Sequence, residues 1–170
     1  MNTSTVKLYS FDYAELKTYS TAALFILGNI ALPQLCHLVP DGGRILLPIY
    51  FFTLLGAYKY GWRVGLLTAL LSPLLNSAIF GMPAVAALPV ILFKSVVLAF
   101  AAGFAASHFK KASLPIIAGV VLFYQIVGSA FEWAFTGSFV EGVRDFTRGI
   151  AGMAIQIFGC WAIIRCILKR

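Results

Sequence analysis

Charged side chains are scarce in this chain. Lys, Arg, Asp and Glu together make up 11% of its 170 residues, whereas hydrophobic residues make up 61%. A soluble domain is about one quarter charged, and a chain of this length cannot hide so much apolar surface from water. The composition therefore excludes an ordinary soluble domain and indicates an integral membrane protein surrounded by the lipid bilayer.

Cysteines and catalytic signatures are scarce as well. Cys36, Cys160 and Cys166 are odd in number and lack metal-binding or redox spacing, which argues against a disulfide framework. The sequence contains no HExxH, no GxSxG and no nucleotide-binding loop. We therefore expect neither an enzyme nor a bound metal ion or cofactor.

Long apolar runs are what the chain has instead. About 20 apolar residues cross a bilayer as a helix, and these runs lack the alternation of an outer-membrane barrel. We predict an all-α integral membrane protein, in which a six-transmembrane-helix bundle forms a single domain over residues 1–170. A polar cytoplasmic lead at 1–19 precedes the bundle, and the second helix is short enough to be tilted or to span only part of the bilayer. The predicted helices cover about 20–38, 45–59, 62–80, 88–107, 113–136 and 146–168.

Basic residues predict how the bundle is oriented. With the N-terminus in the cytoplasm, nine Lys and Arg residues face inward and only Arg44, Arg144 and Arg148 face outward. Cytoplasmic loops carry an excess of positive charge, so we predict that both termini are cytoplasmic. The net charge of +7 is spread over the segment ends and forms no basic patch, so we expect no nucleic-acid partner.

Two opposite charges lie inside predicted spans, at similar depth. Lys94 is five residues from the outer end of its helix, roughly 8 Å down, and Glu132 is about four residues, roughly 6 Å, from the outer end of the next. Ionisable residues inside a membrane usually face the bundle interior, are paired, and often mark a substrate path. The two residues are therefore candidate partners, and either a ligand site or a purely structural ion pair accounts for them.

Other polar residues share helix faces with these charges or lie near them. Gln125 follows the spacing of Glu132 on the fifth span, and Arg148 and Gln156 share a face of the sixth. Trp133 can stack on a planar ligand or belong to the interfacial belt of aromatic residues. The outward loop CHLVPDGGRILLP can close over a ligand or be an ordinary tight turn. The candidate substrate-binding residues are His37, Asp41, Arg44, Asn76, Lys94, Gln125, Glu132, Trp133, Arg144, Arg148 and Gln156.

The stretch LPIYFFTLLGAYKYGWRVGLLTALLSPLLNSAIFGMP, residues 47–83, combines glycine-punctuated spans, a YGWRVG turn and an FGMP loop. In this stretch, and in its predicted topology, the chain resembles a substrate-binding S component of energy-coupling factor (ECF) transporters, the vitamin-uptake systems of prokaryotes. The resemblance implies a multi-pass protein of the cytoplasmic (inner) membrane that binds a vitamin or vitamin precursor near its outer side. It also implies two kinds of partner, a membrane scaffold protein and two cytoplasmic ATPases. Asn2 stands where nickel and cobalt members carry a histidine, so the resemblance implies no metal substrate.

Two other functions stay open. Cell-shape proteins of the MreD type are similar in size and would bind protein partners rather than a small molecule. A small stand-alone carrier would need a continuous polar path, whereas the inner halves of the last three spans are almost wholly apolar. For a binding subunit, the mixture of basic and acidic candidates fits a polar ligand that is anionic or zwitterionic.

Overall fold

The computed structural model describes residues 7–38 and 40–167, and this part of the chain is helical without strands. Four segments are long and apolar enough to cross a membrane: Leu16–Cys36, Trp62–Phe80, Val85–Phe109 and Leu114–Thr136. These segments confirm the all-helical, membrane-type architecture. The helices are α1 Leu16–Cys36, α2 Gly42–Leu46, α3 Phe51–Tyr60, α4 Trp62–Phe80, α5 Leu88–Phe109, α6 Leu114–Thr136, α7 Phe139–Gly142, α8 Arg144–Arg148 and α9 Ile150–Ala162, the last continued by a π-helical turn at Ile163–Ile167.

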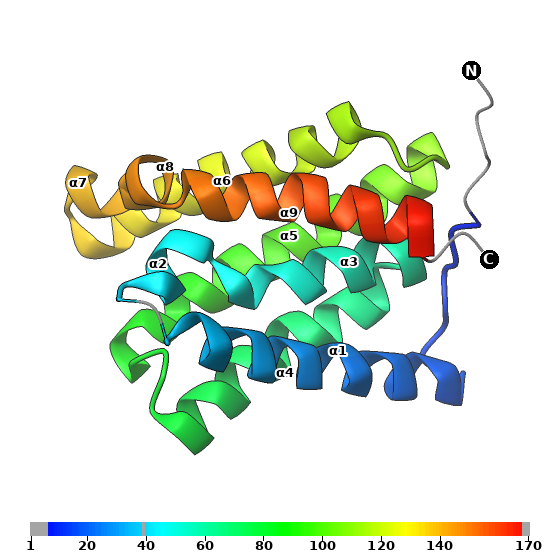
Figure 1. Cartoon of the computed structure of the whole chain (residues 1–170), viewed down its shortest axis with the longest axis horizontal. Coiled ribbons are helices and arrows are strands. Elements are labelled where there is room, and N and C mark those ends of the chain that lie inside the picture. The colour runs from blue at the N-terminus through cyan, green and yellow to red at the C-terminus, as the bar shows by residue number, and fades with distance from the viewer. Residues whose placement is uncertain (1–6, 39, 168–170) are drawn as a thin grey trace.

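The long helices run side by side along the long axis of the molecule (Figure 1). The beginning of α1 and the end of α9 lie at one end, and the short helices α2, α7 and α8 lie at the other. α2 contacts both α8 and α9, so the short helices belong to one structural layer. We call the end formed by α2, α7 and α8 the mouth, because the cavities described below open there.

Two of the six predicted helices are interrupted near the mouth. The predicted helix 45–59 is divided at Leu47, whose φ of 46° lies in the left-handed region, and only α3 continues below it. The predicted helix 146–168 is divided at Gly149, between α8 and α9. Periodicity did not reveal either break, because the segments on both sides of each break are helical and only a change in the direction of the helix axis separates them.

α3 can be shorter than a membrane span because other helices enclose it. Eight of its ten residues are buried, and it packs against α1, α4, α5 and α9. A helix of this length cannot cross a bilayer alone. Irregular backbone at membrane depth is tolerated where protein surrounds it, which explains how the turn above α3 can exist inside the bundle.

The broken backbone at Leu47 is satisfied by a side chain from α9. Gln156 is fully buried, and its Nε2 donates a hydrogen bond to the Leu47 carbonyl oxygen at 3.3 Å. Its Oε1 accepts a hydrogen bond from the Tyr124 hydroxyl at 2.8 Å. An unpaired carbonyl in a low-dielectric interior is costly, so Gln156 holds the break closed and ties α6 to α9.

Glycines allow the central helices to approach closely. A Cβ added at Gly65 of α4 would lie 2.3 Å from Ala57 Cβ and 2.8 Å from its Cα, and one added at Gly103 of α5 would lie 2.5 Å from Trp62 Cβ. Small residues at helix contacts let backbones pack tightly in membranes. The outer faces of the same helices expose Leu74, Phe104 and other large apolar residues, as lipid contact requires.

We expect Gly65→Ala to destabilise the protein by about 1–3 kcal/mol, because the added methyl group meets the backbone of α3 and the core cannot expand freely. Gly119→Ala in α6 is the matched control. No atom lies within 4 Å of a Cβ added there, so this change should be neutral or stabilise the helix by up to about 1 kcal/mol. Unfolding of the two purified variants measures the difference, and equal stabilities would contradict close packing at Gly65.

Candidate functional site

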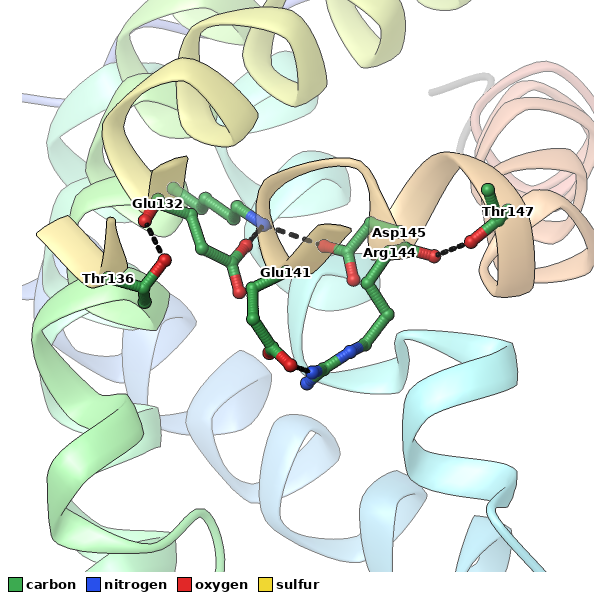
Figure 2. Close-up of polar contacts among 7 residues, drawn as sticks. Glu132, Thr136, Glu141, Arg144, Asp145 and Thr147 are labelled. Carbon is green, nitrogen blue, oxygen red and sulfur yellow. Dashed lines mark hydrogen bonds and ion pairs between the residues drawn. The ribbon is translucent and has the colours of Figure 1, made fainter. Parts of the chain in front are cut away.

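A buried lysine joins three helices just inside the mouth. Lys94 of α5 is 1% exposed, and its Nζ lies 2.5 Å from Glu132 Oε2 of α6 and 2.8 Å from Asp145 Oδ2 of α8. Figure 2 shows Glu132 and Asp145 with their carboxylates close to each other at this contact. We call Lys94, Glu132 and Asp145 the carboxylate–lysine triad.

A glycine makes room for the lysine side chain. A Cβ added at Gly128 of α6 would lie 2.4 Å from Lys94 Cγ. The aliphatic part of Lys94 therefore crosses α6 at a position where no larger residue fits. This contact explains why Gly128 lies one turn before Glu132 on the same helix face.

The triad carries one excess negative charge. Two carboxylates surround one ammonium group, and each of them accepts a hydrogen bond from Lys94 Nζ through only one oxygen. Glu132 Oε1 and Asp145 Oδ1 accept no hydrogen bond from any described residue, and the two side chains are 14% and 16% exposed. The neighbouring Arg144 is ion-paired with Glu141 of α7 and adds no net charge (Figure 2).

Two adjacent cavities lie at the mouth. The first, of about 360 Å³, contains the triad together with Glu141 and Arg144, and we call it the charged lobe. The second, of about 610 Å³, is lined by His37, Asp41, Asn76 and the loop Gly81–Ala84, and we call it the amide lobe. Gly43, Ile49, Ala87 and Ile91 line both lobes. Together the lobes have the size of a site for a small organic molecule.

A network of amides supports the amide lobe. Asn29 of α1 is fully buried, donates to Thr53 Oγ1 at 3.0 Å and Ser72 Oγ at 3.3 Å, and accepts from the Phe52 amide. Asn76 of α4 donates through Nδ2 to the carbonyl oxygens of Asn29 and Ser72, at 2.9 and 3.1 Å. These bonds hold α1, α3 and α4 together. The Asn76 Oδ1 atom, although buried, has no hydrogen-bond partner among the described residues.

The structure brings six of the eleven predicted site residues to the two lobes. Lys94, Glu132 and Arg144 line the charged lobe, and His37, Asp41 and Asn76 line the amide lobe. The predicted partnership of Lys94 and Glu132 is present as a direct ion pair. The outward loop therefore contributes His37 and Asp41 to a cavity wall.

The other five predicted residues do not line either lobe. Gln125 is buried on α6 without a hydrogen-bond partner among the described residues, and Gln156 bridges Tyr124 and Leu47. Trp133 is half exposed and packs edge-on against Phe139, and Arg148 is exposed. None of these four lines either lobe, and the side chain of the fifth, Arg44, lies outside the described part of the chain.

The residue that the sequence-based list omitted is Asp145. It lies 51 positions from Lys94, at the beginning of a helix of five residues, where a solvated carboxylate is the ordinary interpretation. Its helical spacing from Arg148 and Gln156, which places the three residues on one face of the predicted sixth span, was the available evidence that it belongs to the site. Within the described residues, no group of three or more His, Cys, Asp and Glu side chains is arranged to hold a metal ion.

Comparison with known proteins finds no family model, no curated protein and no solved structure that matches this chain. The resemblance to S components therefore depends on the motifs in residues 47–83 and on the helical architecture. The chemistry of the two lobes is the remaining guide to function.

We expect the triad to respond non-additively to mutation. Glu132→Gln or Asp145→Asn alone leaves Lys94 with one carboxylate, so each should change the free energy of unfolding by no more than about 1 kcal/mol. The double variant leaves a buried ammonium without a counter-ion and should lose about 3–5 kcal/mol. Unfolding of the four proteins in the same detergent tests this, and two small effects that simply add would show that Lys94 has another counter-ion.

Proposed function

We propose that this protein is the substrate-binding membrane subunit of an ECF-type importer. It captures a vitamin or vitamin precursor at the outer side of the prokaryotic cytoplasmic membrane. The observation that carries the proposal is the pair of adjacent lobes at one end of the bundle, with ion-paired carboxylates in the wall of one and His37, Asp41 and Asn76 in the wall of the other. A cavity with a few convergent polar groups is the usual form of a small-molecule site.

The apolar inner half of the bundle favours capture over independent transport. Below the triad, α5 and α6 meet through buried apolar residues such as Leu98, Ala102, Ile117 and Val121. A polar molecule bound at the mouth has no polar route between these helices. Release to the cytoplasm therefore requires a movement driven from outside the chain, and a scaffold protein with two ATPases supplies it in this proposal.

A purely structural role of the MreD type is less well supported by the same cavity. A protein that only contacts other proteins has no evident use for two adjacent cavities with charged and polar residues in their walls. The cavity therefore favours the binding subunit.

The proposal predicts that the protein retains a small organic molecule when it is extracted from its native membranes. Mass spectrometry of the denatured, purified protein should recover one dominant molecule in near-stoichiometric amount, and a scaffold protein with two ATPases should co-purify under mild extraction. The Gly128→Leu variant is the control, since its side chain displaces Lys94 from the charged lobe. An empty wild-type protein that co-purifies with no ATPase would contradict the proposal.

The proposed orientation, with both termini in the cytoplasm, is testable on native cysteines. Cys166 near the C-terminal end is exposed, whereas Cys36 and Cys160 are buried. A membrane-impermeant maleimide should therefore label the protein in inside-out vesicles and leave it unlabelled in right-side-out vesicles. The Cys166→Ser variant controls for the site of labelling, and labelling from the outside would reverse the topology.

A further inference from the structure

The charges that line the charged lobe do not balance. Lys94 and Arg144 are the positive residues, and Glu132, Glu141 and Asp145 are the negative ones. Arg144 forms an ion pair with Glu141, and Lys94 forms ion pairs with both Glu132 and Asp145. Among the described lining residues one negative charge is therefore left over in a partly enclosed space, where an uncompensated charge is costly.

The geometry decides which group a bound molecule meets. Lys94 is 1% exposed, whereas the carboxylates of Glu132 and Asp145 are 14% and 16% exposed and each has an oxygen that accepts no hydrogen bond from the described residues. The lysine thus lies behind its two carboxylates. An anion entering the lobe would approach carboxylate oxygens, and a cation would complete their coordination.

The amide lobe supplies an independent observation. Both acceptors of the Asn76 amide nitrogen are backbone carbonyl oxygens, which fixes the orientation of the side-chain amide. Its Oδ1 is therefore an acceptor and cannot be exchanged for the donor by a flip. Asn76 lines the amide lobe, but this oxygen is itself buried and has no partner among the described residues, so the lobe presents mainly apolar surface at this position.

The wall shared by the two lobes is mainly apolar. Ile49, Ala87 and Ile91 contribute side chains to both, and Gly43 contributes backbone. An apolar surface beside the carboxylates suits a ligand with an apolar or aromatic part.

We infer that the cavity selects an organic cation: a small molecule with an ammonium, amidinium or similar N–H-bearing cationic group at Glu132 and Asp145, and an apolar part against the wall shared by the two lobes. This inference rests on the proposed function and specifies its ligand. It replaces the anionic or zwitterionic ligand expected from the sequence, in which Lys94, Arg144 and Arg148 counted as available cations. In the structure, the first two are ion-paired and the third is exposed and lines neither lobe.

The test uses three probes of the same shape and different charge: benzamidine as the cation, benzamide as the neutral molecule and benzoate as the anion. Binding to the purified full-length protein is measured by calorimetry and by the shift in melting temperature, after any retained molecule has been removed by dialysis. Benzamidine should bind about tenfold or more tightly than benzamide, and benzoate should bind weakest. A charge-assisted hydrogen bond to a carboxylate is the physical source of the difference.

Matched variants test whether Glu132 and Asp145 are the carboxylates that bind the cationic probe. Glu132→Gln and Asp145→Asn should each weaken benzamidine binding by about tenfold and leave benzamide binding nearly unchanged. Asp12→Asn is the control, because Asp12 forms an exposed ion pair with Arg63, outside both lobes. The comparison of probes on the wild-type protein needs no variant, so it stands even if a substitution impairs folding.

The outcomes separate the two proposals. Equal binding of the three probes, tighter binding of benzoate, or no binding of any probe overturns the cation assignment. A molecule recovered from the native protein would still support capture in each of these cases, and an anionic one would itself overturn the assignment. A protein that retains nothing and binds no probe overturns both.

Discussion

The mouth of this protein depends on the cost of keeping an ammonium group out of water. Lys94 is buried where the surroundings cannot solvate it, so its charge has to be matched by side chains from other helices. Glu132 and Asp145 provide that match from α6 and α8. The short helix α8 packs against α2, α6, α7 and α9, and the ion pair with Lys94 links it to α5 as well.

The same constraint explains why small residues lie where they do. Two oppositely charged side chains can meet inside a bundle only if the backbones that carry them come close. Gly128 admits the stem of Lys94 against α6, and Gly65 and Gly103 bring α4 close to α3 and α5 to α4. Away from the mouth the core is mainly apolar, and some of the polar side chains buried there, such as Asn29 and Gln156, are tied into hydrogen bonds between helices.

This division gives the molecule two parts with different tasks. The packed inner half resists the passage of a polar molecule, while the mouth offers two lobes, with ion-paired carboxylates in the wall of one and other polar side chains in the wall of the other. The breaks at Leu47 and Gly149 contribute to the lobes, because they separate the short helices α2 and α8, which line the lobes, from α3 and α9. Gln156 offsets the cost of the first break by satisfying the Leu47 carbonyl.

The sequence by itself determined the membrane character and the positions of the long helices, since these follow from local composition: the predicted helix 62–80 covers the same residues as α4. It also placed Lys94 and Glu132 at one depth, because depth follows from counting residues along a helix. Only the tertiary structure decided that Asp145 pairs with Lys94, that Gln156 bridges Tyr124 and Leu47, and that Arg148 is exposed. Each depends on how a helix is rotated and where its axis breaks, and these are fixed by contacts between residues far apart in the chain. The sign of the charge offered to a ligand was decided at that level, because it depends on which charges neutralise one another.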